Sequence, residues 1–133
     1  MSGLVIDTHV VVWYLVHPEN LSRLAKEAIL QTEGSGDPIF ISAITLVEMR
    51  YLVEKGRLVQ GVLQGTTDAL DDVAGPLALH PLDRGVAQTL ALIARDDVPD
   101  MPDRIIAATA LHLNLPLVTR DHRIRASSIT TIW

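Results

Sequence analysis

The stretch IFISAITLVEMRYLVEKG, residues 39–56, places a short apolar run directly in front of a longer segment with helical spacing. Ile39–Ile41 follows Pro38 and is predicted to form a buried strand, because short apolar runs next to turn residues favour strands. Ser42 is of a type that commonly caps helices, so a helix is predicted to begin there and to run to about Gly56. A strand that leads straight into a helix is typical of α/β proteins.

The same alternation continues along the rest of the chain. The other predicted strands, each a short apolar run, are Leu4–Ile6, Leu77–Leu79, Leu117–Thr119 and Ile129–Ile132. The other predicted helices are Val10–Val16, Val62–Val73, Val86–Ala94, a helix after Ser22 and a helix opened by Pro102. The helix after Ser22 is expected to bury one stripe, formed by Leu24, Ala25, Ala28 and Ile29. Loops are predicted at Glu33–Pro38 and Asp96–Asp100. This order favours a parallel sheet covered by helices on both faces, in a single domain over residues 1–133.

Composition limits the possible classes of protein. The chain has 133 residues, of which 48% are hydrophobic, and this surplus of apolar residues suggests a surface reserved for a partner. Cysteine is absent, which excludes disulfides and thiolate metal sites and permits a cytoplasmic location. The longest apolar run, Val10–Val16, is too short to span a bilayer, and no signal peptide is recognisable, so no membrane partner is expected. The net charge of −5 counts against a nucleic-acid binder, which is normally basic.

Two carboxylates follow predicted strands directly. Asp7 ends the run Leu4–Ile6, and Asp121 lies just past Leu117–Thr119. In parallel sheets of this kind, ligands bind beyond the carboxyl ends of the strands. We therefore expect Asp7 and Asp121 to meet at one edge of the sheet.

Two further carboxylates stand on apolar helix faces. Glu48 has Ile44 four residues before it and Leu52 four residues after it, so all three share one face of the predicted helix. Asp103 precedes, at helical spacing, the apolar residues Ile106, Ala107 and Ala110. A solvated carboxylate has no physical reason to occupy either position.

Each acid also has a structural interpretation. Asp7, Asp103 and Asp121 stand where helices can begin, and aspartate is a good capping residue. Arg50 or Arg104 can pair with some of these acids, because buried charges are normally paired or bound to metals.

Taken together, the four carboxylates favour a cation site, because clustered like charges repel one another unless a cation is bound. Oxygen ligands without cysteine favour Mg²⁺ or Mn²⁺, and phosphodiester hydrolysis is a natural chemistry for such a site.

Several blocks of the sequence resemble, in order and spacing, those of PIN-domain ribonucleases, and in particular the VapC-type toxins of type II toxin–antitoxin (VapBC) pairs. These blocks are VIDTHVVVW (5–13), LSRLAKEAI (21–29), ISAITLVEM (41–49), DMPDRIIAATAL (100–111) and LVTRD (117–121). The resemblance implies a three-layer α/β/α sandwich with a central parallel sheet. It also implies a metal-dependent endoribonuclease that is usually dimeric and is held inactive by a cognate VapB-like antitoxin.

The resemblance carries specific residues over by position. It implies that Asp7, Glu48, Asp103 and Asp121 are the catalytic, metal-binding acids. Asp100 matches an acid that often stands three residues before the third one, and Thr8 and Thr119 match supporting polar residues. Relatives often carry an aromatic residue where this chain has Pro102, which can alter the wall of the pocket but not the ligand set.

Basic and aromatic residues suggest how RNA would bind. Arg104, Arg120, Arg123 and Arg125 all fall in the last third of the chain, near two of the acids, and are candidate RNA contacts or ordinary solvated charges. Trp13 and Tyr14 are interpreted as core or interface residues, because they lie inside an apolar run. The five histidines, His9, His17, His80, His112 and His122, show no shared metal-ligand spacing, although His9 and His122 stand near site acids.

Three other functions remain open at this point. A receiver domain has similar length and binds Mg²⁺, but it would need a late lysine, and the only lysines are Lys26 and Lys55. A PIN-like binding module without catalysis, or a housekeeping RNA-processing nuclease, would share most of the features described above.

Overall fold

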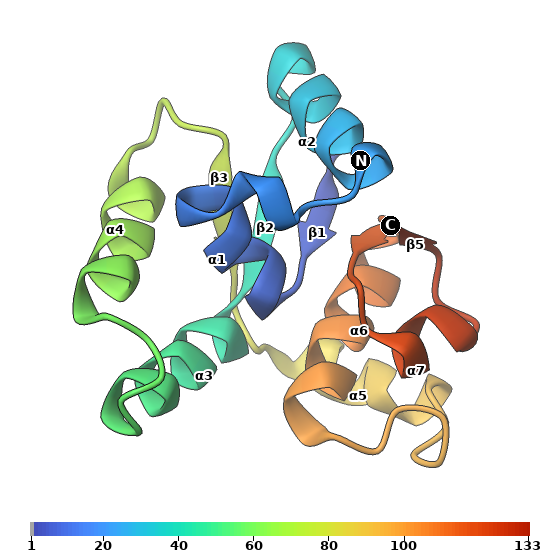
Figure 1. Cartoon of the computed structure of the whole chain (residues 1–133). Coiled ribbons are helices and arrows are strands. Elements are labelled where there is room, and N and C mark those ends of the chain that lie inside the picture. The colour runs from blue at the N-terminus through green and yellow to red at the C-terminus, as the bar shows by residue number, and fades with distance from the viewer. Residues whose placement is uncertain (1) are drawn as a thin grey trace.

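The computed structural model describes residues 2–133, and its centre is a five-stranded parallel sheet with strand order β3-β2-β1-β4-β5 (Figure 1). The strands are β1 (Leu4–Ile6), β2 (Ile39–Ser42), β3 (Leu77–His80), β4 (Leu117–Val118) and β5 (Thr131–Ile132). Every neighbouring pair runs parallel. The parallel sheet predicted from the alternation of elements is thereby confirmed.

Helices fill the connections between the strands. They are α1 (Thr8–Val16), α2 (Arg23–Ser35), α3 (Ala43–Glu54), α4 (Gln60–Asp71), α5 (Arg84–Thr89), α6 (Met101–Leu113) and α7 (His122–Ala126), with short 3₁₀ turns η1 (Pro18–Asn20) and η2 (Leu90–Leu92). None of the helices within residues 2–133 is long and apolar enough to cross a membrane.

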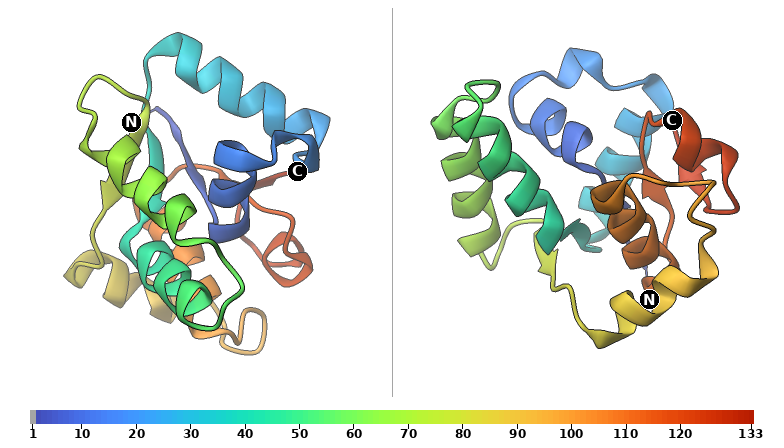
Figure 2. Two further views of the ribbon diagram at one scale, coloured as in Figure 1. Left: turned by 60° about the vertical axis from the view of Figure 1, so that its left-hand side comes forward. Right: turned by 90° about the horizontal axis from the view of Figure 1, so that it is seen from below.

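The alternation of side chains along the strands builds two cores. In β1, Leu4 and Ile6 point to a core shared with α1, α2 and α4, whereas Val5 points to a core shared with α5, α6 and α7. Figure 2 shows the strands between α2 on one side and α5 and α6 on the other. The fold is therefore the predicted three-layer α/β/α sandwich.

The strand order fixes where a site can form. Strand β1 lies in the middle of the sheet, between β2 and β4, and the connections run outward from it in both directions. A place where neighbouring connections leave a strand in opposite directions is a topological switch point, and it leaves a crevice beyond the carboxyl ends of the strands. Residues that follow β1 and β4, and the first turns of the helices nearby, therefore face one another.

Predicted helix starts are confirmed by their caps. The Ser42 hydroxyl accepts the backbone N–H of Ile44 at 3.3 Å, so β2 passes into α3 without a loop. The Ser22 hydroxyl caps α2 in the same way, through Ala25, and Pro102 lies in the first turn of α6.

The predicted loop and stripe near α2 are partly wrong. Helix α2 continues through Ser35, so the loop predicted to begin at Glu33 begins at Gly36. The helix ends at Gly36, whose φ of 73° is a left-handed conformation that glycine adopts without steric cost. Leu24 was expected on the buried stripe, but it is 53% exposed because its position lies off the face that Ala25 and Ile29 bury.

The helix predicted at Val86–Ala94 is also shorter than expected. Helix α5 ends at Thr89 and continues as the 3₁₀ turn η2. The Arg104 guanidinium donates hydrogen bonds to the carbonyls of Leu90 and Ile93, at 2.9 and 2.8 Å, and so satisfies backbone groups outside a regular helix. Strands β4 and β5 are likewise shorter than their apolar runs, with two residues each.

Candidate metal centre

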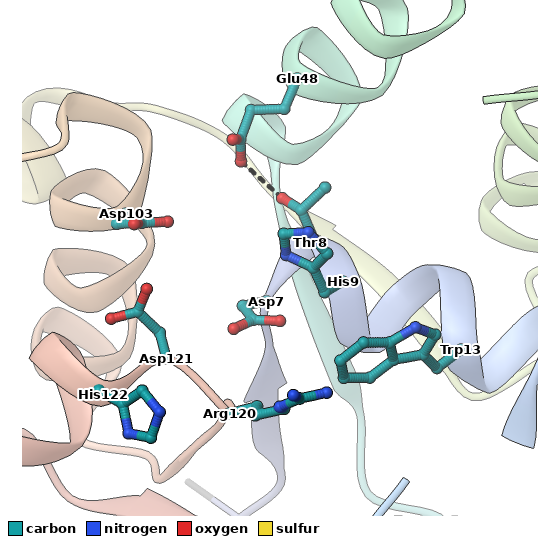
Figure 3. Close-up of a pocket in the computed structure, with 9 residues that line it drawn as sticks. All are labelled: Asp7, Thr8, His9, Trp13, Glu48, Asp103, Arg120, Asp121 and His122. Atoms are coloured by element: carbon teal, nitrogen blue, oxygen red, sulfur yellow. Dashed lines mark hydrogen bonds between the residues drawn. The ribbon is translucent and has the colours of Figure 1, made fainter. Parts of the chain in front are cut away.

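Four acids predicted from the sequence line a single cavity of about 430 Å³ (Figure 3). Asp7 follows β1, Asp121 follows β4, Glu48 lies on α3, and Asp103 lies in the first turn of α6. The other lining residues are Thr8, His9, Trp13, Arg120 and His122. The crevice at the switch point of the sheet is therefore an acidic pocket.

Asp7 is both a helix cap and a member of the pocket. Its Oδ1 accepts the backbone N–H of Val10 at 3.0 Å, and its Oδ2 accepts the hydroxyl of Thr119. The residue is only 6% exposed. Burial raises the pKa of Asp7, although the hydrogen bonds from Thr119 and Val10 act in the opposite direction. The Asp7 carboxylate therefore caps α1 and also lines the acidic pocket.

Glu48 is half-buried and accepts a hydrogen bond from a neighbouring hydroxyl group. The Thr8 hydroxyl donates to Oε1 of Glu48 at 2.6 Å, and it lies 3.1 Å from the Thr45 hydroxyl. Burial raises the pKa of Glu48. Arg50, which the sequence offered as a partner, donates instead to the side-chain oxygen of Gln60 at 3.3 Å.

The N-terminus of α6 contributes two acids. Asp100 caps the helix by accepting the backbone N–H of Asp103 at 3.2 Å, so the capping role considered for Asp103 belongs to Asp100. Asp100 is exposed and does not line the cavity, but single oxygens of Glu48, Asp100 and Asp103 lie within 4.8 Å of one another.

Negative charge accumulates around Asp103. Burial, followed by the charges of Asp100, Asp121, Glu48 and Asp7, raises the pKa of Asp103 to about 7. Within residues 2–133, none of these five acids forms a salt bridge with a basic side chain. Uncompensated carboxylate oxygens of this kind are the donor set that Mg²⁺ and Mn²⁺ prefer.

Thr119 connects two of the acids. Its hydroxyl donates to Asp7 and accepts the backbone N–H of Asp121 at 3.0 Å. Asp121 in turn caps α7 by accepting the N–H of Ile124 at 3.0 Å. Hydroxyl groups that orient carboxylates are typical of the outer shell of metal sites, and both Thr8 and Thr119 occupy such positions.

Only one of the four candidate arginines reaches the cavity. The Arg120 guanidinium lies over the indole of Trp13, with 5.8 Å between its Cζ and the ring centroid. Arg104 is instead bound to the carbonyls of η2, Arg123 donates to the carbonyl of Asp96 at 3.3 Å, and Arg125 is exposed away from the cavity.

The interpretation of Trp13 as a core or interface residue is incomplete. Trp13 packs against the core beneath α1, but it also forms a wall of the cavity, with ring centroids 5.8 Å from His9 and 5.7 Å from Trp133. The spacing of His9 and Trp13, four residues apart on one helix, is the signal that could have placed Trp13 beside the acids. Nothing in the sequence pointed to Trp133.

The charge repulsion at Asp103 predicts how stability of the metal-free protein depends on pH. Because the folded-state pKa of about 7 exceeds the ordinary value of 3.8, the folded state retains a proton that the unfolded state has lost. The free energy of unfolding should therefore fall as pH rises from about 4 to 7. Asp103→Asn should remove this part of the decrease and be more stable than the wild type at pH 8, by about 2 kcal/mol after allowing for solvent screening.

Thermal melts in EDTA at pH 5 and pH 8 measure this effect. Asp97→Asn, which replaces an exposed acid in the preceding loop, is the matched control and should follow the wild type. A wild-type protein that is as stable at pH 8 as at pH 5, with no gain in Asp103→Asn, would contradict the predicted repulsion.

Comparisons with known proteins agree with this arrangement. A family model described as the PIN domain matches residues 4–128. Ribonuclease VapC22 from Mycobacterium tuberculosis is 29% identical over 136 residues, and the match covers 100% of both chains.

Two solved structures have similar folds. One is VapBC2 from Rickettsia felis bound to a DNA fragment from their promoter, with a TM-score of 0.72, 18% identity, and coverage of 98% of this chain and 97% of the other. The second is a toxin-antitoxin complex from Klebsiella pneumoniae, with a TM-score of 0.62, 25% identity, and coverage of 98% and 96%. Since the family model spans nearly the whole described chain, including all of the pocket acids, the chain belongs to the PIN domain family.

Proposed function

We propose that this chain is a metal-dependent endoribonuclease and the toxin of a VapBC-type toxin–antitoxin pair. The observation that carries the proposal is the convergence of Asp7, Glu48, Asp103 and Asp121 on one cavity, where none of them forms a salt bridge with a basic side chain of residues 2–133. The relative named Ribonuclease VapC22, and the resemblance to VapBC complexes, favour RNA as the substrate and an antitoxin as the partner.

The four pocket acids would hold Mg²⁺ or Mn²⁺, with Asp100 as a further ligand. Bound there, a divalent cation supplies a water of lowered pKa and offsets the negative charge that develops on the phosphate. Thr119 holds one oxygen of Asp7, and Thr8 holds one oxygen of Glu48, so neither carboxylate has to be oriented when the substrate arrives. The buried position of Asp7 keeps bulk water away from that side of the pocket.

The net charge of −5 is compatible with RNA binding in this arrangement. Two divalent cations would offset the four pocket acids, which would bring the charge from −5 to about −1. Arg120 then provides a positive group at the rim, positioned by its contact with Trp13. A guanidinium in this place can contact an RNA phosphate, and the indole beside it offers a surface on which a base can stack.

Arg120→Gln is expected to weaken binding to all RNAs alike, by about five- to tenfold at low salt, because a phosphate contact carries no sequence information. The slope of log affinity against log salt should flatten by about 0.7, the contribution of one phosphate on a single strand. Binding is best measured in an Asp103→Asn background, so that the RNA stays intact. Arg125→Gln, an exposed arginine outside the cavity, is the control, and equal affinities of the two variants would show that Arg120 is an ordinary solvated charge.

An apolar groove adjoins the acidic pocket and suggests where an antitoxin binds. The groove has a volume of about 340 Å³ and shares Thr8, His9 and Glu48 with the acidic pocket. Its rim exposes large side chains: Val47 is 49%, Tyr51 59% and Met101 64% exposed. A partner helix that covers this rim could place an arginine among the acids, where its guanidinium can bridge carboxylates.

Incubation of the purified chain with a mixed RNA pool tests the proposed activity. We expect internal cleavage with Mg²⁺ or Mn²⁺ and none with EDTA. Cleavage that survives EDTA would refute metal dependence, and failure to cleave any RNA with either metal would favour a PIN domain that only binds. The receiver-domain alternative is wrong, because the chain belongs to another family.

Co-expression with a neighbouring small gene product separates a toxin from a housekeeping nuclease. A toxin should form a stable complex with little activity, whereas a housekeeping enzyme should remain free and active. We also propose that the chain acts in the cytoplasm as a homodimer, and size-exclusion chromatography with light scattering tests the dimer.

A further inference from the structure

A second group of metal-ligating side chains lies outside the acidic pocket. His80 ends β3, Asp83 caps α5, and His112 lies in the last turn of α6. One ligand atom of each residue lies within 4.8 Å of the ligand atoms of the other two. None of the three lines the acidic cavity, so this group is separate from the candidate nuclease site.

Two possible ligand atoms of this group, Nε2 of His80 and Oδ2 of Asp83, are not engaged in hydrogen bonds. The Nε2 atom of His80 is buried and has no hydrogen-bond partner, which is costly for a polar atom unless something binds it. Asp83 uses Oδ1 to accept the backbone N–H of Val86 at 2.9 Å, while Oδ2 lies 3.7 Å from Nε2 of His80. The hydrogen bond from Val86 lowers the pKa of Asp83.

The His80 and His112 rings lie close to each other and to neighbouring groups. A Cβ atom on Gly85 would lie 2.5 Å from Cε1 and 2.8 Å from Nε2 of His112, so the ring in this position lies directly against the glycine. The His80 ring packs edge-on against Phe40, with centroids 6.1 Å apart, and its centroid lies 6.0 Å from that of His112. The geometry therefore brings two imidazoles and a carboxylate to one place.

We propose that His80, Asp83 and His112 bind a transition-metal ion, with Zn²⁺ the preferred ion. Two imidazole nitrogens and one carboxylate oxygen form a ligand set typical of zinc, and a fourth position is left for water. Mg²⁺ and Mn²⁺ instead prefer oxygen ligands, which the acidic pocket provides. The bound ion would join the end of β3, the start of α5 and the end of α6, and so stabilise the fold independently of nuclease activity.

A melting experiment with competing metals tests the site. The protein is freed of metal with EDTA, the EDTA is removed, and excess Mg²⁺ is added to occupy the acidic pocket. Adding Zn²⁺ at micromolar concentration should then raise the melting temperature by several degrees. Co²⁺ in its place should give a visible absorption band, which reports the geometry of the ligands directly. No shift and no band would overturn the proposal.

Matched variants decide which residues bind. His112→Gln changes an exposed side chain, and Asp83→Asn keeps an oxygen for the helix cap, so both should fold in EDTA. Each should weaken Zn²⁺ binding at least about tenfold. His17→Gln, an exposed histidine beside Glu19, and Asp103→Asn should respond like the wild type. A Zn²⁺ response that persists in His112→Gln and Asp83→Asn, or disappears in Asp103→Asn, would place the ion elsewhere and refute the site.

Discussion

Asp103→Asn is expected to lower RNA cleavage at least about a hundredfold, because a direct metal ligand should contribute no less than an outer-shell residue does. Asp103 lies where the charges of all the other pocket acids converge, as its pKa of about 7 indicates. Asparagine keeps the size of the side chain but carries no negative charge. It therefore weakens the binding of a divalent cation and alters its coordination without leaving a cavity.

The Asp103→Asn variant should lose activity without unfolding, so a loss of cleavage can be distinguished from a loss of structure. Asp103 does not cap α6, since Asp100 does, so the replacement breaks no backbone hydrogen bond made by the side chain. The metal-free variant should be at least as stable as the wild type at pH 8. Cleavage rates are compared at saturating Mn²⁺, with Asp97→Asn as the control. Cleavage by Asp103→Asn at a rate within a few-fold of the wild type would eliminate this residue as a ligand.

Elements whose pattern is local could be predicted from the sequence. The strands Leu4–Ile6 and Ile39–Ile41 are short apolar runs, each followed directly by a residue that caps a helix, and both lie where expected. The end of α5 could not be predicted, because it depends on Arg104, a residue fifteen positions further along that binds the carbonyls of Leu90 and Ile93. Helix ends that are set by distant side chains leave no local signal.

The same distinction applies to the sites. Glu48 and Asp103 could be found because a charge on an apolar face contradicts its local pattern. Trp13 obeys its local pattern, so its spacing from His9 was the only local signal for the cavity wall, and its contact with Arg120 forms only once the sheet has formed. His80 and His112 are 32 residues apart and come together only because α6 packs beside α5, the helix that follows the strand of His80, and no spacing rule describes this packing.

Tyr51→Ala is expected to weaken the complex with the proposed antitoxin by about a hundredfold, the loss typical of a large aromatic anchor in a protein interface. Tyr51 is 59% exposed at the rim of the apolar groove, so its truncation should leave the fold unchanged. It does not line the acidic cavity, so the free variant should cleave RNA like the wild type. Affinity is measured by calorimetry or by titration of nuclease activity with the partner.

Anchoring and inhibition can be separated by changing the two proteins in turn. Leu92→Ala removes an apolar side chain of η2 that is 72% exposed and lies outside the groove, and this variant should bind the partner normally. Replacing the partner's arginine that enters the acidic pocket should restore activity while the complex is retained, whereas Tyr51→Ala should lose the complex itself. That arginine is expected in the partner's C-terminal segment. If Tyr51→Ala binds as tightly as Leu92→Ala, the groove is not the docking surface. If inhibition survives removal of every basic residue from that segment, the partner blocks the enzyme without reaching the acids.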